Sequence, residues 1–522
     1  MKKLFYIAIF VLLSFVMISC KDDHSYSLNI NSINGLRSSV VVNYTISDPN
    51  EELKESALKA EIKKVGSDTI FSSRDLVYNT TATEIKFSGL ESGVNYEVAF
   101  YAGVDGKQVT LATREITTSV EGNSTESPYL IDSADDFSNI LRNDLNGHYK
   151  LVADIDFAGT SINPMFTNTT QFTGTFDGNG YTISNFKAGS AESLGTVNYK
   201  YYGLFGYVGA DAVIKNVKLD SFEFHVKRTS TTAFVALIAG YNAGTIEDVT
   251  VTNSSIYLEI DNSSSPNTTD SSGNLTGYYV GGLVGQNKNG ATIKNCSVDV
   301  DITVKAKRGA IVGGICAINF DNSNVQKANV IENCKYNGTI DVTLANTSAT
   351  SYETTTCVGG IIGKNYNAVS NCEVTGSVKL TSSFNVPSKT MYRLYLGGLV
   401  GWNASDKSAV KNSKVVANLA LDSKDALEVY FGLLVGRNGG TGTVNYSVVT
   451  GCTYQLPENG TVTVVAFEGN EHIGLVGYPE NTDATNKTEG SVVAKVTYYH
   501  TTKDAEDKDV TVAKDPVDLE IK

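Results

Sequence analysis

The sequence predicts an all-β protein in which a right-handed parallel β-helix follows an immunoglobulin-like β-sandwich. The first observation is a glycine-rich phrase that recurs eight times across residues 203–477, for example as GGLVGQN and GGLVGWN. The second is a polar phrase such as IKNC or IENC, which follows most copies of the first. The third is a separate pattern of strand-like runs over residues 26–119, which lacks both phrases.

The last small residue of each glycine-rich phrase gives the repeat spacing. Successive spacings are 34, 45, 32, 46, 38, 35 and 41 residues, which is the range of stacked repeat arrays. The intervening runs, such as ATIKNCSVDVDITV, alternate with period two and are rich in Val, Ile and Thr, which indicates strands and excludes helical repeats. A propeller blade needs four antiparallel strands with tight hairpin turns. The units offer only two or three runs, so a β-helix is favoured.

Equivalent residues of successive coils should lie about 4.8 Å apart, so eight coils would extend roughly 40 Å. An aliphatic column is expected to point inward. It consists of Leu204, Ile238, Leu283, Ile315, Ile361, Leu399, Leu434 and Leu475.

The polar phrase supplies a column suited to an amide ladder. It consists of Asn216, Asp248, Asn295, Asn333, Asn371, Asn412 and Asn445. A third column, at the end of the glycine-rich phrase, is expected at sharp corners, where Asn tolerates left-handed backbone. It consists of Asn242, Asn287, Asn319, Asn365, Asn403 and Asn438.

The phrase GGLVGQN, followed by a strand of the type GxIxNCxV, resembles the GLUG repeat. That family occurs in bacterial surface adhesins and beside immunoglobulin-A-cleaving metallopeptidases. The resemblance implies that the repeats, assigned to residues 203–480, form a stalk or platform. It implies no activity, because chemistry in such proteins resides elsewhere.

The first residues have the pattern of an export signal. Two lysines precede an apolar run over residues 4–18, which predicts a signal peptide at residues 1–19 that is too short for a membrane span. The MIS before Cys20 resembles a bacterial lipobox, which implies lipidation of Cys20 and attachment to the outer membrane. The acidic tether at residues 20–25 resembles the tag of surface-exposed lipoproteins in Bacteroidetes-type Gram-negative bacteria. A lipoprotein facing the periplasm is the alternative.

The composition fits an exported protein and argues against nucleic-acid partners. The chain has 56 acidic and 42 basic residues, a net charge of -14 and a pI of about 5.0, so it lacks the basic surface that phosphate backbones require.

Residues 26–119 have the strand spacing of an immunoglobulin-like sandwich. The stretch FSGLESGVNYEVAFYAGVDG resembles a fibronectin type III domain, with Leu90 and Tyr96 at the family's corner positions. The resemblance implies a spacer, and a domain that binds a ligand itself is the alternative. A polar linker at residues 120–127 follows.

Residues 128–202 are assigned to a helical cap and the first coils of the β-helix. Ser133 has the features of an N-cap for an amphipathic helix over residues 134–142, which would cover the open end of the stack. Asp154, Asp156, Asp177 and Asn179 suggest a calcium site by their spacing, but the sequence FDGNG is better explained as a tight turn. Residues 481–522 are assigned to a last strand and an acidic tail.

The sequence contains no recognisable catalytic motif. None of the five histidines belongs to an HExxH pair, and no GxSxG elbow occurs. Polysaccharide lyases and glycoside hydrolases on β-helices need carboxylates clustered on one face. Acidic residues are scattered over the coils. Asp299 and Asp301 lie on one strand face and Asp341 occupies a similar place two strands on, but a solvated face explains them equally well. We therefore expect no catalysis and no cofactor; a polysaccharide-degrading lyase or hydrolase is the alternative.

Three cysteines, Cys296, Cys334 and Cys372, occupy one column in consecutive coils. Their spacing lies within the Cα range of a disulfide, but side chains in register point the same way, which favours a stack of reduced thiols. Without a CxxC motif, no metal site is expected.

One column contains chemically different side chains in successive coils, which is typical of a position that points outward. Tyr241, Lys364, Trp402 and Arg437 lie between the last glycine and the Asn of their phrases. Aromatic faces stack on sugar rings and Arg provides planar hydrogen bonding. We therefore hypothesise a binding strip for glycans or host proteins, as in an adhesin. Ordinary exposed side chains, or a purely structural subunit of a surface assembly, would give the same pattern.

Overall fold

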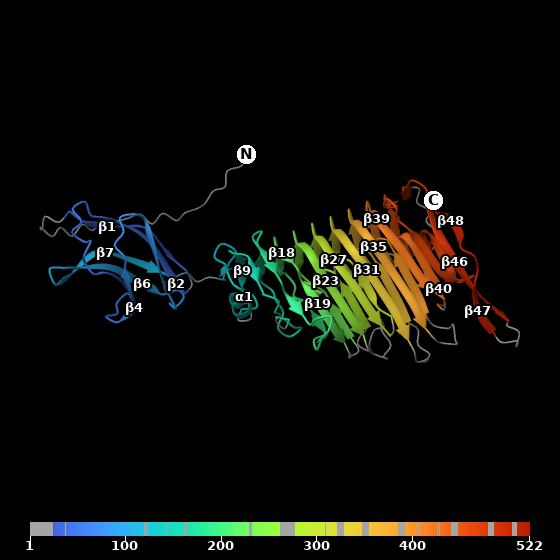
Figure 1. The fold of residues 1–522 in the computed structure, drawn as a ribbon, viewed down its shortest axis with the longest axis horizontal. Helices are drawn as coiled ribbons and strands as arrows, with labels where there is room; N and C mark the ends of the chain where they lie inside the picture. The colour runs from blue at the N-terminus through green and yellow to red at the C-terminus, as the bar shows by residue number, and fades with distance from the viewer. Residues whose placement is uncertain are drawn as a thin grey trace. The chain divides into compact units, whose positions relative to one another are not determined.

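The computed structural model divides into two compact units, Met1–Glu121 and Gly122–Lys522 (Figure 1). The structure describes residues 25–521 apart from 37, 119–121, 123, 142–143, 161–163, 229–231, 261–276, 308, 321–327, 347–353, 385–391, 406–407, 425, 427, 440–446, 479–484 and 504–508. The predicted signal peptide, Cys20 and Asn445 lie outside the described residues. The predicted class is confirmed, since a β-sandwich precedes a parallel β-helix.

The first unit is an antiparallel sandwich of a three-stranded sheet, β1-β2-β5, and a four-stranded sheet, β4-β3-β6-β7. Its strands are β1 (Ser27–Gly35), β2 (Ser39–Ser47), β3 (Leu58–Lys64), β4 (Ile70–Leu76), β5 (Thr83–Ser88), β6 (Asn95–Val104) and β7 (Lys107–Thr117). Alternate residues point inward, as in β2, where Val40, Val42, Tyr44 and Ile46 are buried. This period-two pattern is the one that the sequence shows.

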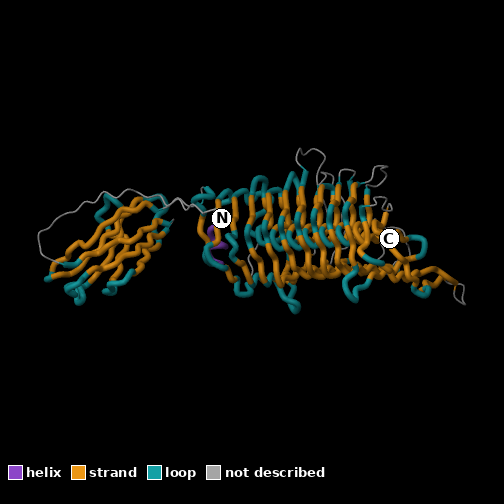
Figure 2. The backbone as a smooth tube through the Cα atoms, turned by 90° about the horizontal axis from the view of Figure 1, so that it is seen from above, coloured by secondary structure: helices purple, strands orange, loops and turns teal. Residues whose placement is uncertain are grey.

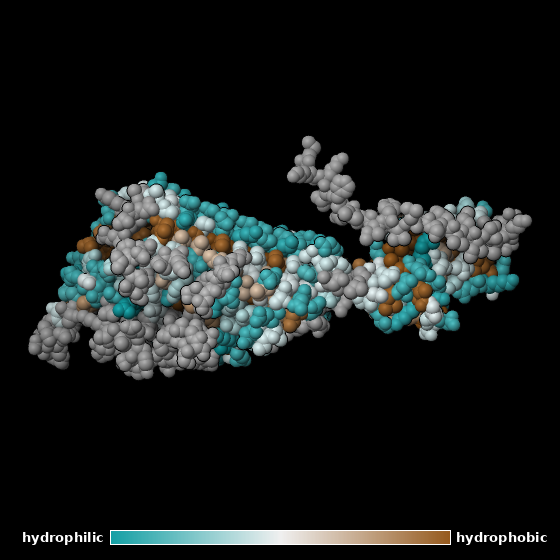
Figure 3. All heavy atoms as spheres, turned by 180° about the vertical axis from the view of Figure 1, so that it is seen from behind, coloured by the Kyte–Doolittle hydropathy of each residue, from teal (hydrophilic) through white to brown (hydrophobic). Residues whose placement is uncertain are grey.

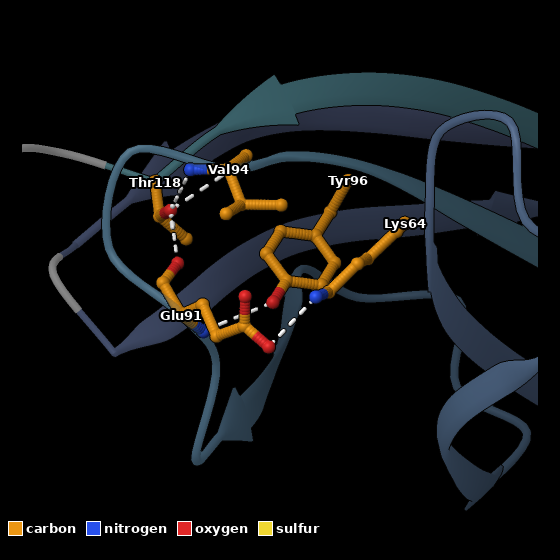
Figure 4. A network of polar contacts seen from close by, with 5 residues as sticks. All are labelled: Lys64, Glu91, Val94, Tyr96 and Thr118. Atoms are coloured by element: carbon orange, nitrogen blue, oxygen red, sulfur yellow. Dashed lines mark hydrogen bonds and ion pairs between the residues drawn. The ribbon is translucent and has the colours of Figure 1, made fainter.

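Tyr96 closes one corner of the sandwich. Its ring is fully buried, and its hydroxyl accepts a hydrogen bond from the Glu91 N–H at 2.9 Å (Figure 4). The Thr118 hydroxyl donates to the Glu91 carbonyl at 2.6 Å, and the Lys64 ammonium pairs with the Glu91 carboxylate at 2.7 Å. Leu90 is buried beside them. These contacts fix the turn that leads into β6.

We expect Tyr96→Phe to lower the unfolding free energy of the sandwich by about 1–2 kcal/mol, because the Glu91 N–H loses its partner. Calorimetry on the full chain would measure it. Tyr101→Phe is the matched control, because Tyr101 lies on the same strand, is half-buried, and its hydroxyl makes no hydrogen bond to any described residue. Equal losses in the two variants would contradict the role of the Tyr96 hydroxyl.

The second unit is a parallel β-helix whose wall consists of three sheets, with strands stacked along its long axis (Figures 1 and 2). The ten-stranded sheet contains short strands in register, so that Ile293, for example, pairs with Ile331. In sheet order the strands are β8 (Tyr129–Ile131), β9 (His148–Leu151), β11 (Thr175–Asp177), β17 (Val213–Lys215), β22 (Thr245–Glu247), β26 (Thr292–Lys294), β30 (Val330–Glu332), β34 (Ala368–Ser370), β38 (Ala409–Lys411) and β41 (Val448–Thr450).

The seventeen-stranded sheet contains the longest strands, whose side chains alternate between the interior and solvent, as in β27. Its strands are β10 (Ile155–Asp156), β12 (Thr182–Ser184), β13 (Lys187–Ala188), β14 (Gly195–Thr196), β18 (Lys218–Asp220), β19 (Glu223–Arg228), β23 (Thr250–Ile260), β27 (Ser297–Ala306), β31 (Lys335–Asn346), β35 (Glu373–Phe384), β39 (Lys414–Ser423), β42 (Thr453–Gln455), β43 (Val462–Phe467), β45 (Lys487–Glu489), β46 (Val492–Lys503), β47 (Asp509–Ala513) and β48 (Val517–Ile521).

The fourteen-stranded sheet contains the glycine-rich phrases, and each complete coil contributes two strands to this sheet. The strands before the glycines are β15 (Tyr201–Tyr202), β20 (Thr232–Val235), β24 (Gly277–Gly281), β28 (Ile311–Gly313), β32 (Thr354–Gly359) and β36 (Tyr392–Gly397). Those after the glycines are β16 (Gly206–Val208), β21 (Ala239–Asn242), β25 (Val284–Asn287), β29 (Cys316–Asn319), β33 (Ile362–Asn365) and β37 (Val400–Asn403). In β40 (Glu428–Asn438) and β44 (Glu471–Tyr478) both parts form one strand.

Both ends of the stack carry added structure. The helix α1 (Ala134–Ile140) begins after Ser133, whose hydroxyl accepts from the Asp136 N–H at 3.2 Å. Phe137 lies edge-on to three phenylalanines of the first coils at 5.6–6.4 Å, so α1 covers the apolar end as expected. At the other end, β47 and β48 pair antiparallel with β46. The predicted tail therefore contains two further strands.

The inward aliphatic column is confirmed, since every member is at most 4% exposed. The roles assigned to the two amide columns were wrong in part. Left-handed corners fall in the polar phrase, with φ of 55° at Asn216, 55° at Asn295 and 54° at Asn333. This column also forms a partial ladder, because Asn333 Nδ2 donates to Asn295 Oδ1 at 3.2 Å.

The continuous ladder is formed by the Asn that ends each glycine-rich phrase. Its members, all described, lie in strands without positive φ. Five successive amide–amide bonds of 2.8, 3.1, 2.9, 2.8 and 2.9 Å join Asn242, Asn287, Asn319, Asn365, Asn403 and Asn438. All six are buried. A buried amide without these partners would be costly, so the ladder fixes the vertical register of the coils.

Candidate binding surface

The glycine-rich phrase bends the outer face of the fourteen-stranded sheet. At Gly397 a Cβ atom would lie 2.1 Å from the Val400 carbonyl oxygen and 2.7 Å from the Gly436 nitrogen. Equivalent distances to the carbonyl three residues on are 1.9–2.2 Å at Gly281, Gly313, Gly359 and Gly432. Glycine is therefore required by close backbone approach. Leu399 and Val400 both point inward after the bend, so the strict alternation of a strand is broken there.

Two outward columns flank this bend, and we call them together the outer seam. The first lies two residues before the bend and consists of Tyr201, Phe234, Tyr279, Ile311, Cys357, Tyr395, Tyr430 and His472. The second lies after it and consists of Tyr207, Tyr241, Gln286, Ile318, Lys364, Trp402, Arg437 and Tyr478. Most of their buried members form a hydrophobic cluster separate from the interior. Hydrophobic residues also reach the surface of this unit on the side seen in Figure 3.

The structure brings three of the four predicted binding residues together. Lys364, Trp402 and Arg437 occupy one position in consecutive coils. Tyr241 lies three coils before Lys364, with Gln286 and Ile318 between them. Its ring is buried and stacks on Tyr207 at 4.1 Å.

Trp402 lies between two cations. The Lys364 ammonium is 4.0 Å from the indole centroid, and the Arg437 guanidinium carbon is 5.3 Å from it, so both cations make cation–π contacts. The indole N–H donates to the Gly439 carbonyl at 2.9 Å, and Trp402 is 9% exposed. The groups that remain half-exposed are therefore Lys364 and Arg437.

The end of the seam near β44 carries an open aromatic group. The His472 ring stacks on Tyr430 at 4.7 Å and lies 4.8 Å from Tyr478, which is 44% exposed. Arg437 also lies 5.3 Å from the Tyr430 ring and donates to the Tyr395 hydroxyl at 3.2 Å. The first column was missed in the sequence, although tyrosine recurs two residues before the bend, in YYG, YVG, YLG and YFG.

The charge state of the seam at neutral pH follows from burial. Burial raises the pKa of Tyr395 to about 12 and that of the Cys357 thiol to about 12, so both stay protonated. Burial works against ionisation of Glu428, but its hydrogen bond from Arg393 at 2.6 Å holds its pKa below the usual value. Glu428 therefore stays ionised and paired with Arg393.

The other sequence candidates occupy structural positions. Asp154 accepts the Thr182 N–H, Asp156 the Ala158 N–H, and Asp177 the Asn179 N–H, at 2.7–2.8 Å. Asp156 and Asp177 thus cap turns, and Asp154 joins two coils. In the described residues no three His, Cys, Asp or Glu side chains lie close enough to hold a metal ion.

Two of the acidic residues of the long strands, and the cysteine column, likewise make structural contacts. Asp301 accepts the Thr339 N–H at 2.8 Å, and Asp341 pairs with Lys379 at 3.6 Å. The thiols of Cys296, Cys334 and Cys372 are free. Each donates to the carbonyl two residues before it, at 3.2 Å. These carbonyls also accept a backbone N–H from the neighbouring coil.

The fold and the seam define a parallel β-helix built from coils with a glycine bend. Two stretches, residues 276–303 and 354–379, match the sequence model of the GLUG motif, so the chain carries GLUG motifs. The part of the chain that the structure describes contains no helix with the length and hydropathy of a membrane span.

Two curated relatives share parts of the sequence. A putative Gly-rich membrane protein of Evansella cellulosilytica is 33% identical over 134 residues, which are 24% of this chain and 14% of that protein. Halomucin of Haloquadratum walsbyi is 38% identical over 128 residues, 22% of this chain and 1% of that protein. The alignments thus span a small part of either relative. Among solved structures, an IgA1 Protease matches 89% of this chain and 30% of its own, with a TM-score of 0.34 and 15% identity.

Proposed function

We propose that this protein is a non-catalytic cell-surface lipoprotein that binds glycans or host proteins through its outer seam, as an adhesin does. The observation that carries the proposal is the register of Lys364, Trp402 and Arg437 over three coils of a rigid stack. A binding surface on rigid elements loses little conformational entropy when a ligand binds.

Further support comes from the names of the relatives and from the N-terminal part of the sequence. One relative is named a membrane protein and another halomucin. The residues around Cys20 resemble a lipobox, which supports lipid attachment to the outer membrane. The sandwich, which resembles fibronectin type III in sequence, would act as a spacer between this anchor and the β-helix.

The test is binding of the full chain to a glycan array and to host surface proteins. Trp402→Ala removes the ring that holds both cations, and Arg437→Glu reverses one of the charges; we expect each variant to lose at least about tenfold in affinity. Lys495→Glu, an exposed lysine of β46, is the matched charge-reversal control. Unchanged binding in both seam variants would overturn the proposal, as would release of reducing ends or unsaturated uronates from any glycan.

A further inference from the structure

We propose that the ligand of the outer seam is an acidic polysaccharide that lies along the stack axis, with its carboxylate or sulfate groups on Lys364 and Arg437. This inference rests on the proposed function, because it names the chemical class of ligand for the same surface.

The first step is that these two cations have no anionic partner among the described residues. On the seventeen- and ten-stranded sheets, lysines pair with carboxylates of neighbouring coils. Such pairs join Lys187 to Glu223, Lys294 to Glu247, Lys335 to Glu373 and Lys379 to Asp341. Lys364 and Arg437 contact aromatic groups instead. The nearby carboxylate of Glu428 is bound by Arg393.

The second step is that positive charge here contrasts with the chain as a whole. The net charge is -14, so two uncompensated cations on one strip form a local site for an anion. Both are only partly exposed, which strengthens their attraction to an anion compared with fully hydrated lysines. The planar guanidinium of Arg437 suits a carboxylate or sulfate in two-point hydrogen bonding.

The third step is spacing. Lys364 and Arg437 lie one coil on either side of Trp402, so their backbone positions are separated by two coil spacings, roughly 10 Å. One coil spacing is close to the length of one sugar unit in an extended chain. The charged groups of the two cations lie somewhat closer together, because both contact the Trp402 ring, at 4.0 and 5.3 Å from its centroid. Acidic groups on alternate sugars of an extended polysaccharide that runs parallel to the column would meet the outer sides of these two cations.

The fourth step is the accessible aromatic surface beyond Arg437. Tyr478, the next residue of the column, is 44% exposed, and His472 is half-buried beside it. A sugar next to the one held by Arg437 would lie over this pair, where ring faces favour stacking. A compact anion such as phosphate is too small to contact this aromatic surface or to match the spacing between the two cations.

The experiment uses the fluorescence of Trp402, the one tryptophan of the chain, which lies between the two proposed contacts. The full chain is titrated with oligomers of galacturonate, sulfated oligosaccharides of heparin type, and neutral cello-oligosaccharides of equal length. We expect the acidic oligomers to shift the Trp402 emission, to bind at least about tenfold more tightly than the neutral ones, and to weaken as salt rises.

The variants Lys364→Gln and Arg437→Gln should each weaken acidic oligomers about tenfold and leave neutral ones unchanged, since each removes one charge-assisted contact. Lys495→Gln is the control. Thermal unfolding followed by circular dichroism confirms that each variant is folded. Equal affinity for neutral and acidic oligomers, unchanged affinity in both seam variants, or tighter binding of an acidic protein or of DNA would overturn the inference. Binding of neutral glycans or proteins through the seam would still leave the proposed function intact, whereas absence of any seam-dependent ligand would overturn both.

Discussion

Gly397→Ala is expected to lower the unfolding free energy of the β-helix by about 4 kcal/mol, at the upper end of single substitutions. The added methyl carbon would lie 2.1 Å from the Val400 carbonyl oxygen and 2.7 Å from the Gly436 nitrogen. Both are backbone atoms, so no side-chain rotation relieves the overlap. The bend between β36 and β37 would have to open, and β40 would have to move away from it. Urea denaturation followed by far-UV circular dichroism measures the loss.

Gly490→Ala separates this steric requirement from ordinary glycine preferences. Gly490 has φ of 86° and no atom within 4 Å of an added Cβ. Its substitution should therefore cost only the left-handed strain of about 1 kcal/mol. Equal losses of stability in the two variants would mean that the bend requires glycine for its backbone conformation and not because neighbouring backbone atoms leave no room for a Cβ.

Much of the fold is predictable from the sequence because stacking repeats the same physical requirement in every coil. The inward aliphatic column must stay apolar in each copy, so its periodicity alone places Leu283 or Leu399 in the core. The cap could be predicted because Ser133 and Phe137 follow local helix rules. Local patterns of this kind need no knowledge of the neighbouring coils.

The two amide columns were harder to assign, because both contain Asn once per coil. Asn can hold a left-handed corner or bridge two coils, and its presence does not distinguish the two uses. The pairing of strands decides between them. Asn365 lies at the end of a paired strand, whereas Asn371 follows its strand with φ of 54°.

The last coil shows the same limit. The sequence places its polar phrase at VNYS, residues 444–447, whereas Val449 pairs with Val410. Gly451, with φ of 66°, then occupies the corner, and Cys452 lies in the cysteine column. The number of residues before the phrase varies between repeats, so the earlier Asn appeared equivalent in the sequence.

Only one of the two columns of the outer seam could be predicted from the sequence. Tyr395 and Trp402 are seven residues apart, so regular alternation would place them on opposite faces of the sheet. Because the bend turns both Leu399 and Val400 inward, the two rings point outward together, with centroids 5.2 Å apart. The periodicity of the sequence can identify each column separately. It does not show that the two columns lie side by side, because the alternation of the strand is broken at the glycines.

Asn365→Ala is expected to cost about 5 kcal/mol of unfolding free energy. The Asn365 side chain donates to Asn403 Oδ1 at 2.8 Å and to the Asn367 carbonyl at 2.7 Å. It accepts from Asn319 Nδ2 at 2.9 Å and from the Asn367 N–H at 3.1 Å. Alanine leaves three buried partner groups unsatisfied, at about 1–3 kcal/mol each, and part of this is recovered by relaxation. The Asn367 carbonyl still accepts from the Ala409 N–H at 2.9 Å. Denaturation in urea measures the loss.

Asn371→Gly is the matched control in the neighbouring column. Asn371 is exposed and has φ of 54°, and its side chain makes one long bond of 3.3 Å to Glu332. Glycine accepts the left-handed backbone without strain, so the change should stay within about 0.5 kcal/mol. The ratio of the two losses measures how far the stack depends on its buried amides. A small loss at Asn365 would mean that the aliphatic column alone holds the coils in register, and the ladder would then merely follow from their stacking.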